Sequence, residues 1–227
     1  MILYVDHEHP SAQNQSWGKN IMAGRMKIKY RVEEITGDVC LIMRYDKVSL
    51  EWLQQFDIRA ILISGSGTDP EHYAPEDLEG LAAVYRSGLY PVFGLCGGWQ
   101  FMAQSFGATI TPMGALKAGD SMPDTETIFR PGYRQEFGFA PVRIDRPHPL
   151  FEGLGDAPKF WMAHYMEIRD LPEGFSPYMS TDYCQVQFAA HETLPLYGSQ
   201  FHPEHYSDEN TDGKQMLRNF FRLHGII

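Results

Sequence analysis

Three features are scarce in this sequence, and the first is cysteine. Three of the 227 residues are cysteine. An odd number of cysteines argues against a framework of disulfides, so we expect a reducing compartment, the cytoplasm. Long apolar runs are missing as well: the chain has no stretch of roughly eighteen apolar residues and no basic-then-apolar signal peptide. The sequence therefore predicts a protein that neither spans a membrane nor is exported.

Positive charge is the third scarce feature. Lysine and arginine together number 19, against 29 aspartate and glutamate residues, which gives a formal net charge of −10. Because nucleic-acid phosphates attract basic surfaces, this balance and the lack of a basic cluster argue against nucleic acid as a partner. With 43% hydrophobic residues the chain can bury a sizeable core. Since no linker or repeat interrupts it, we expect a single domain over residues 1–227.

The most informative stretch is residues 90–100, which read Tyr-Pro-Val-Phe-Gly-Leu-Cys-Gly-Gly-Trp-Gln. An apolar run with strand character ends in Gly-x-Cys-x-Gly and passes into helical spacing, the pattern of a nucleophile elbow with cysteine in place of serine. Small neighbours are needed because the turn is strained. The helix N-terminus would favour the thiolate of Cys96. Cys96 is therefore the candidate nucleophile, whereas Cys40 and Cys184 lie in apolar surroundings typical of inert core cysteines.

A candidate base for this cysteine lies near the C-terminus. His202 follows a predicted strand at residues 195–200, and Pro203 disfavours the helical conformation for it, so its imidazole should project from the strand end. Glu204 can accept a proton from that imidazole. We expect Cys96 to attack, His202 to transfer the proton and Glu204 to fix the tautomer. The spacing alone leaves open whether Cys96 and His202 meet in space.

Apolar runs alternate with helical segments in the first half of the chain. Strands are expected at residues 2–5, 39–43, 60–63, 92–95, 108–113, 137–144, 160–163, 184–190 and 195–200, and helices at 74–87, directly after Cys96, and at 212–224. The alternation predicts an α/β fold: an open, mostly parallel, twisted, flavodoxin-like sheet with helices on both faces and extra antiparallel strands in the second half. Ligands bind outside the carboxyl ends of the strands in such sheets, where Cys96, Gly65 and His202 would lie.

Four motifs give the sequence a resemblance to a known family. Residues 94–100 read Gly-Leu-Cys-Gly-Gly-Trp-Gln, residues 197–204 read Tyr-Gly-Ser-Gln-Phe-His-Pro-Glu, residues 61–70 read Ile-Leu-Ile-Ser-Gly-Ser-Gly-Thr-Asp-Pro, and residues 160–164 read Phe-Trp-Met-Ala-His. In order and spacing these motifs are similar to the class I glutamine amidotransferase family, from about residue 38 to the C-terminus. Within that family the chain resembles free-standing proteins similar to the glutaminase part of GMP synthase.

The resemblance implies an activity. Such enzymes hydrolyse the side-chain amide of L-glutamine through a cysteine γ-glutamyl thioester and release glutamate and ammonia. It implies the same catalytic set of Cys96, His202 and Glu204. Backbone N–H groups must stabilise the oxyanion that forms, and one such donor is commonly worth ~3 kcal/mol. By position, the expected donors are the amides of Gly65 and Gly97.

Three more residues are expected at the substrate. Gly67 would let the chain approach it closely, Gln100 would lie one helical turn beyond the nucleophile and reach the amino-acid end of glutamine, and His164 would belong to the substrate-side loop. Two residues depart from the family pattern. Gly97 stands where a larger side chain is usual, and Trp99, near the mouth or on the helix packing face, stands where His or Met is usual. These departures keep the catalytic groups but leave the subfamily open.

The sequence shows no defensible metal-ligand spacing and no phosphate-binding loop, so we expect neither a metal nor a cofactor. In the family the ammonia passes to a synthase, on the same chain or on a separate subunit, so the resemblance implies a synthase or acceptor subunit as the partner. Two alternatives remain open. One is a γ-glutamyl peptidase or hydrolase that uses the same triad on another γ-glutamyl compound, and the other is a non-catalytic subunit that binds a ligand or partner. Residues 112–135, rich in glycine and proline, are expected to form a loop over the site.

Overall fold

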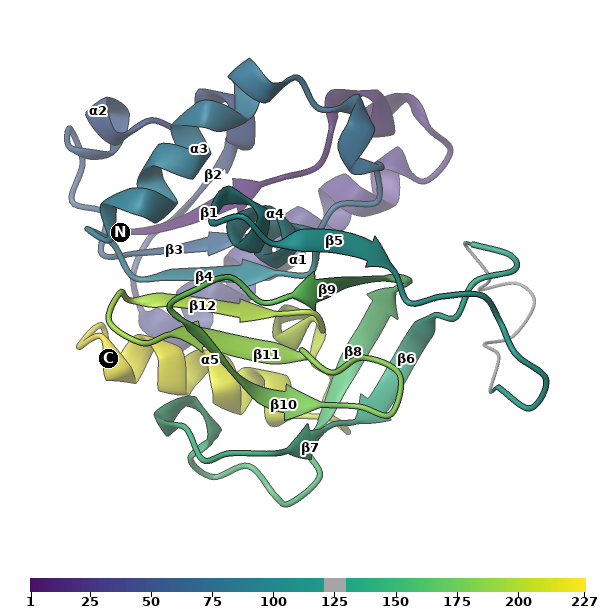
Figure 1. Ribbon diagram of the computed structural model, residues 1–227. Helices are drawn as coiled ribbons and strands as arrows, with labels where there is room; N and C mark the ends of the chain where they lie inside the picture. The colour runs from purple at the N-terminus through teal and green to yellow at the C-terminus, as the bar shows by residue number, and fades with distance from the viewer. Residues whose placement is uncertain (121–129) are drawn as a thin grey trace.

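The fold is built on one twisted sheet. The computed structural model describes residues 1–120 and 130–227. Within these residues the sheet has eight strands, in the spatial order β2 (Cys40–Arg44), β1 (Ile2–Asp6), β3 (Ala60–Ile63), β4 (Val92–Leu95), β12 (Leu196–Ser199), β11 (Phe188–His191), β10 (Phe175–Ser180) and β7 (Arg143–Ile144). Parallel pairing joins β2 through β12, and antiparallel pairing joins β12 through β7 (Figure 1). The expected mostly parallel sheet with added antiparallel strands is confirmed.

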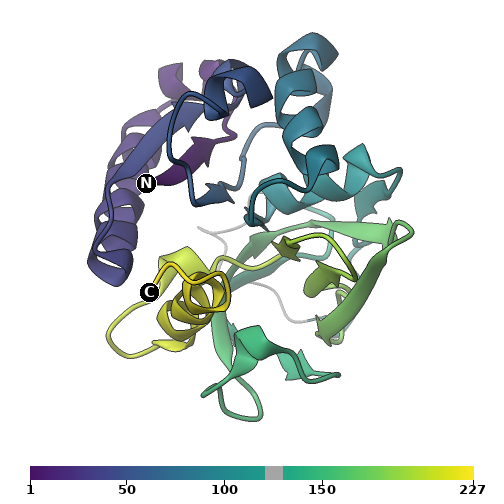
Figure 2. The ribbon, with the colours of Figure 1, turned by 90° about the vertical axis from the view of Figure 1, so that its left-hand side faces the viewer.

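Helices cover both faces of this sheet. They are α1 (Gly18–Thr36), α2 (Leu50–Leu53), α3 (Pro75–Ser87), α4 (Gly97–Ser105) and α5 (Asp212–Leu223). One apolar cluster joins α1 and α5 to the sheet, and a second joins α2, α3 and α4 to the opposite face (Figure 2). In α5 the buried residues Met216 and Phe220 lie one turn apart, so the helix presents a single apolar stripe to the sheet. No helix of the described residues has the length and apolar character needed to cross a bilayer.

Two short ribbons stand apart from the main sheet. One pairs β5 (Thr109–Pro112) with β9 (Met166–Asp170), and the other pairs β6 (Glu136–Pro141) with β8 (Lys159–His164). Figure 1 places the second ribbon on the side toward which β3, β4 and β12 run. An isolated bridge between Trp161 and His202 ties β8 to the chain just after β12. The two ribbons therefore border the edge of the sheet at which the parallel strands have their carboxyl ends.

The sequence pattern predicted most helices and strands close to their observed positions and missed a few. The expected strand at 184–190 begins only at Phe188, because Cys184 lies in a turn: its carbonyl accepts from the Thr181 N–H at 2.8 Å, and its own N–H donates to Thr181 Oγ1 at 3.1 Å. The expected strand at 137–144 is split into β6 and β7 after Pro141, which has no N–H to pair. Helices α1 and α2 and strands β9 and β10 were not predicted.

The elbow helix is fixed to the sheet by its tryptophan. The side chain of Trp99 is fully buried, so it belongs to the packing face and not to the mouth of the site. Its ring lies on the backbone of Gly198 in β12, where an added Cβ would come within 2.0 Å of the ring atoms. Glycine is therefore required at position 198 by the close approach of α4 to the sheet.

We expect Gly198→Ala to lower the free energy of unfolding by about 1–3 kcal/mol, because the new methyl group overpacks the contact with Trp99. Urea denaturation followed by circular dichroism measures this change. Gly24→Ala is the matched control, since a Cβ at Gly24 in α1 meets nothing within 4 Å and should leave the protein equally stable or more stable by about 0.5–1 kcal/mol. A Gly198→Ala protein as stable as the wild type would contradict this packing.

Candidate active site

Cys96 lies at the junction of β4 and α4 in a strained conformation. Its φ of 49° and ψ of −110° make it the one non-glycine residue with positive φ among residues 1–120 and 130–227. The backbone N–H of Cys96 donates to the Ser199 carbonyl at 2.7 Å, which anchors the turn to β12. At Gly94 an added Cβ would lie 2.9 Å from the Trp99 backbone, so the turn tolerates no side chain there. A strained residue persists only where its surroundings over-determine it, and such strain concentrates at functional sites.

His202 comes to Cys96 from the end of β12. Its N–H donates to the Trp161 carbonyl at 2.8 Å, its Nδ1 lies 2.8 Å from Glu204 Oε1, and Cys96 is near enough to influence its pKa. Burial lowers the pKa of His202, but the facing Glu204 carboxylate and the Cys96 sulfur raise it more, to about 10. Burial raises the pKa of Glu204, yet His202 outweighs this and the net shift is downward. The geometry favours an imidazolium held between a carboxylate and the sulfur.

The turn that carries Glu204 is braced from α1. Arg31 donates to the Glu204 carbonyl at 2.6 Å and to the Tyr206 carbonyl at 2.7 Å, and its guanidinium lies 4.0 Å from the centre of the Tyr206 ring. These contacts fix the backbone on which the carboxylate is mounted. Arg31 was not predicted from the sequence, because its position far from Glu204 in the chain offers no local signal.

The turn after β3 faces both Cys96 and His202. At Gly65 an added Cβ would lie 2.7 Å from His202 Cε1 and 3.3 Å from Cys96 Cβ, so a side chain there would push the pair apart. At Gly97 an added Cβ would lie 2.8 Å from the backbone nitrogen of Ser66. The departure of Gly97 from the family pattern thus has a physical reason: the start of α4 lies directly against the turn.

Two glutamines link the helix to the sulfur. Gln100 Nε2 donates to Gln200 Oε1 at 3.0 Å, and Gln200 Nε2 donates to Cys96 Sγ at 3.4 Å. Gln200 is fully buried, and no role was predicted for it from the sequence. A signal was present, because alternate residues of an extended chain point the same way and Gln200 precedes His202 by two.

His164 ends β8 and is buried in a polar cluster of its own. Its Nδ1 lies 3.0 Å from the Met166 carbonyl and its Nε2 lies 2.9 Å from Glu136 Oε2. Burial raises the pKa of Glu136, but His164 lowers it more, so the net shift is downward. The expectation of His164 at the substrate-side loop stays a prediction, with both ring nitrogens already partnered.

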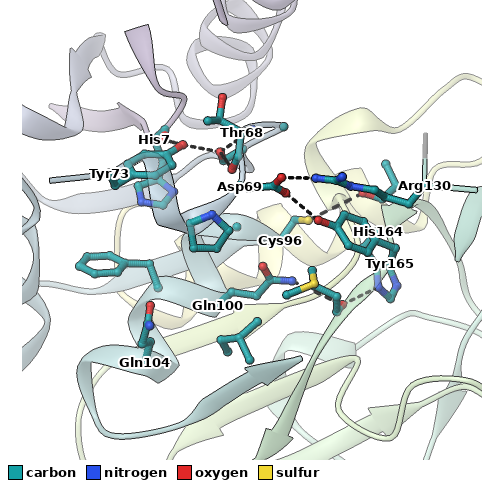
Figure 3. Close-up of a pocket in the computed structure, with 18 of the residues that line it drawn as sticks. His7, Thr68, Asp69, Tyr73, Cys96, Gln100, Gln104, Arg130, His164 and Tyr165 are labelled. Atoms are coloured by element: carbon teal, nitrogen blue, oxygen red, sulfur yellow. Dashed lines mark hydrogen bonds and ion pairs between the residues drawn. The ribbon is translucent and has the colours of Figure 1, made fainter. Parts of the chain in front are cut away.

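A cavity of about 530 Å³ opens at the sulfur. Figure 3 shows Cys96, Gln100 and His164 around it, and Gly67 and Gly97 also line it. Gly65, His202 and Glu204 lie outside the lining. A pocket of this size suits ligands larger than a free amino acid.

Part of the expected loop at 112–135 reaches this cavity. Arg130 is in the lining and pairs with the Asp69 carboxylate, which also accepts from the Tyr165 hydroxyl at 2.7 Å. A bridge between Ala115 and Tyr133 closes the base of the segment. Residues 121–129 lie outside the described residues, so the role predicted for the whole loop stays a prediction.

Two groups of side chains within residues 1–120 and 130–227 have the spacing of metal ligands. One is His202 with Glu204 and His205, and the other is Asp69 with Glu71 and His72. In the first group Glu204 already pairs with His202, and in the second Asp69 already pairs with Arg130. The expectation that the protein holds no metal stays a prediction.

The other two cysteines have different surroundings. Burial raises the pKa of Cys40 to about 12, and it raises the pKa of Cys184 as well. Cys96, in contrast, lines the cavity and receives a hydrogen bond from Gln200. Of the three thiols, this one is placed to attack a ligand.

Comparison with known proteins agrees with this geometry. The model of the family "Glutamine amidotransferase class-I" matches residues 24–223, most of the chain. This protein belongs to the class I glutamine amidotransferase family. The resemblance seen in the sequence motifs is therefore confirmed.

Relatives within the family are GMP synthases and their subunits. The glutamine-hydrolysing GMP synthase of Clostridium novyi is 30% identical over 188 residues, which cover 82% of this chain and 32% of that protein. A subunit of the glutamine-hydrolysing GMP synthase of Methanopyrus kandleri is 34% identical over 141 residues, which cover 62% of this chain and 65% of that subunit. The match thus spans about a third of the bacterial enzyme and just under two thirds of the archaeal subunit.

Solved structures give the same class I amidotransferase fold. A putative GMP synthase subunit from Thermoplasma acidophilum superposes with a TM-score of 0.72 at 25% identity, covering 99% of this chain and 94% of that one. A glutamine amidotransferase from Thermotoga maritima, only 14% identical, shares the fold with a TM-score of 0.63. The mostly parallel sheet and its added antiparallel strands therefore belong to the family architecture.

We expect His202 to remain protonated through neutral pH, since its pKa is raised from 6.5 to about 10. The pairing of protonated His202 with Glu204 contributes its full stabilisation of the fold below pH 6.5, and this contribution is lost as the pH rises through about 10. In Glu204→Gln burial should dominate and leave the ring neutral at pH 7. ¹³C NMR of the histidine side chains, recorded as a function of pH, measures the titration of His202 in the wild type and in Glu204→Gln. His148, whose pKa burial lowers to about 4, is the internal control and should titrate alike in both. Unchanged titration of His202 in Glu204→Gln would contradict this.

Proposed function

We propose that this protein hydrolyses the side-chain amide of L-glutamine through a γ-glutamyl thioester on Cys96 and releases glutamate and ammonia. One observation carries the proposal: the strained Cys96 at the head of α4 contacts His202, whose other nitrogen pairs with Glu204. A nucleophile, a base and a residue that orients the base are the parts needed for acyl transfer.

In the proposed reaction the Cys96 thiolate adds to the amide carbon and forms a tetrahedral oxyanion. His202 then gives its proton to the nitrogen, the C–N bond breaks and ammonia leaves the thioester. His202 next removes a proton from water, the hydroxide adds to the thioester, and glutamate departs as the sulfur becomes the leaving group. Glu204 holds the imidazole in one orientation throughout.

The oxyanion donors are proposed at the start of α4 and the turn after β3. The N–H of Gly97 belongs to the first residue of α4 and has no carbonyl one turn earlier to accept it. The amide of Gly65 stays a predicted second donor. The N–H of Ser66 is a further candidate, because its nitrogen lies directly against Gly97 and donates to no acceptor within the described ranges 1–120 and 130–227.

The acceptor of the ammonia is proposed to be a separate synthase subunit. Two archaeal relatives, from Methanopyrus kandleri and from Methanocaldococcus jannaschii, are named as individual subunits of GMP synthase, and the second is 28% identical over 169 residues. These names support a division of labour in which this chain supplies ammonia to a partner. A thiol nucleophile also suits the cytoplasm, the reducing compartment proposed from the cysteine content.

We expect Cys96→Ala to lower glutamate release from L-glutamine by about 10³-fold or more, because no other group can form the thioester. Coupled detection of glutamate, with ammonia measured in parallel, follows the reaction. Cys40→Ala is the matched control: it removes a buried thiol in β2, outside the cavity lining, and should keep the activity. Equal turnover by Cys96→Ala and the wild type would refute the proposed nucleophile.

A second candidate is hydrolysis of a larger γ-glutamyl compound by the same residues. The cavity volume of about 530 Å³ favours it, as do the apolar lining residues Phe101, Ile110 and Met166, which can pack against a second apolar group. We expect a γ-glutamyl dipeptide with an aromatic second residue to be hydrolysed faster than glutamine if this alternative holds. Parallel kcat/KM measurements on both compounds decide between them, and inactivity on both would support the non-catalytic alternative.

A further inference from the structure

A buried carboxylate lies beneath the turn that follows β3. Glu8, just beyond β1, is 6% exposed. Its Oε2 accepts from the Gly67 N–H at 2.6 Å, and its Oε1 accepts from the Thr68 N–H at 3.2 Å and the Thr68 hydroxyl at 2.6 Å. The Ser66 hydroxyl is 3.4 Å from Oε1. Every described partner of this carboxylate is a neutral donor, and most of them come from one turn.

These bonds decide which backbone amides of the turn remain free. The N–H groups of Gly67 and Thr68 are directed to Glu8. The N–H of Ser66 has no acceptor within residues 1–120 and 130–227, and its nitrogen is the atom that a side chain at Gly97 would strike at 2.8 Å. Glu8 thus engages two of the four amides at residues 65–68 and leaves those of Gly65 and Ser66, of which that of Ser66 lies beside the start of α4.

The hydrogen bonds to Glu8 restrict the conformation of the turn that follows β3. Ser66 stands between Gly65 and Gly67, and glycine opposes peptide rotation least of all residues, so the turn by itself would not keep one orientation. Desolvating a carboxylate is costly unless hydrogen bonds compensate it, and these bonds tie Glu8 to one arrangement of the turn. The segment around it is fixed as well, since the His7 N–H donates to Ser64 Oγ and the His7 carbonyl accepts from the Tyr73 hydroxyl, both at 2.9 Å.

We propose that Glu8 is a positioning residue of the reaction: it orients the turn at residues 65–68 so that the N–H of Ser66 stands beside that of Gly97 as an oxyanion donor. The inference rests on the proposed amide hydrolysis. Glu8 does not line the cavity, so it acts through the turn and not on the substrate. It sets the stability of the tetrahedral intermediate and leaves the sulfur and its base unchanged.

The test compares Glu8→Gln with the wild type on the full chain. A glutamine at this position keeps one acceptor but turns an NH₂ group toward the N–H of Gly67 or Thr68, which should disturb the turn without a change of size. We expect kcat for the compound that the wild type hydrolyses to fall about 10²-fold, comparable to the loss of one oxyanion donor, with KM within about threefold. Iodoacetamide should alkylate Cys96 at the same rate in Glu8→Gln as in the wild type, because that reaction forms no oxyanion.

Glu33→Gln is the matched control. Glu33 also accepts a backbone N–H, that of Cys40 at 3.0 Å, but it lies on α1 and outside the cavity lining. This variant should keep kcat and the alkylation rate. An unchanged kcat in Glu8→Gln would overturn the proposal. So would an alkylation rate that falls in step with kcat, since the whole site would then have collapsed.

A second probe separates this inference from the proposed function. A chloroketone analogue of glutamine accepts the thiolate at its carbonyl, forms an oxyanion, and then loses chloride as the sulfur is alkylated. If the wild type turns over no γ-glutamyl compound, the proposed hydrolysis fails. The inference then stands if Glu8→Gln slows chloroketone inactivation at least tenfold while iodoacetamide alkylation is unchanged. Equal inactivation of Glu8→Gln and the wild type, or no inactivation of either, overturns it.

Discussion

The parallel pairing of β4 with β12 is the constraint on which the site depends. Its register sets Gly94 opposite Gly198 and Leu95 opposite Ser199, so both strands end side by side. The Ser199 carbonyl then receives the N–H of Cys96, and the chain beyond Ser199 delivers Gln200 to the sulfur. The two glycines allow Trp99 to lie on the sheet, and this contact seats the first turn of α4. A slip of one residue would reverse every side chain in this pair.

Charged side chains near the cavity are buried either in ion pairs or among neutral hydrogen-bond donors. His202 faces Glu204 at 2.8 Å and His164 faces Glu136 at 2.9 Å, while Glu8 is surrounded by neutral donors. Buried pairs of this kind add little net stability, because desolvation offsets their attraction. They do fix geometry, because each hydrogen bond holds its carboxylate in one orientation. Contacts within the protein therefore hold these side chains in place, as the proposed hydrolysis requires for electrostatic stabilisation of a transition state.

Local pattern was a good guide to the elements that position Cys96 and His202. The apolar run before Cys96 forms β4, and the segment after it forms α4. The strand before His202 forms β12 one residue inside its expected start and end. Pattern failed for α1, whose buried Ile28, Val32 and Ile35 have helical spacing but share the segment with exposed apolar residues such as Met26 and Tyr30. It also failed at Cys184, where a side-chain bond to Thr181 closes a turn that no periodicity reveals.

The sequence by itself determined the fold type, the tight turn at Cys96 between β4 and α4, and the order of Cys96, His202 and Glu204 along the chain. These follow from backbone rules that act over a few residues: strand and helix periods, small residues in strained turns, and the restriction that Pro203 imposes on His202. Only the tertiary structure decided that His202 reaches the sulfur, that Arg31 braces the turn of Glu204, and that Glu8 lies beneath the turn after β3. These contacts join residues far apart in sequence, and their geometry is set by strand register and helix packing, which no local pattern encodes.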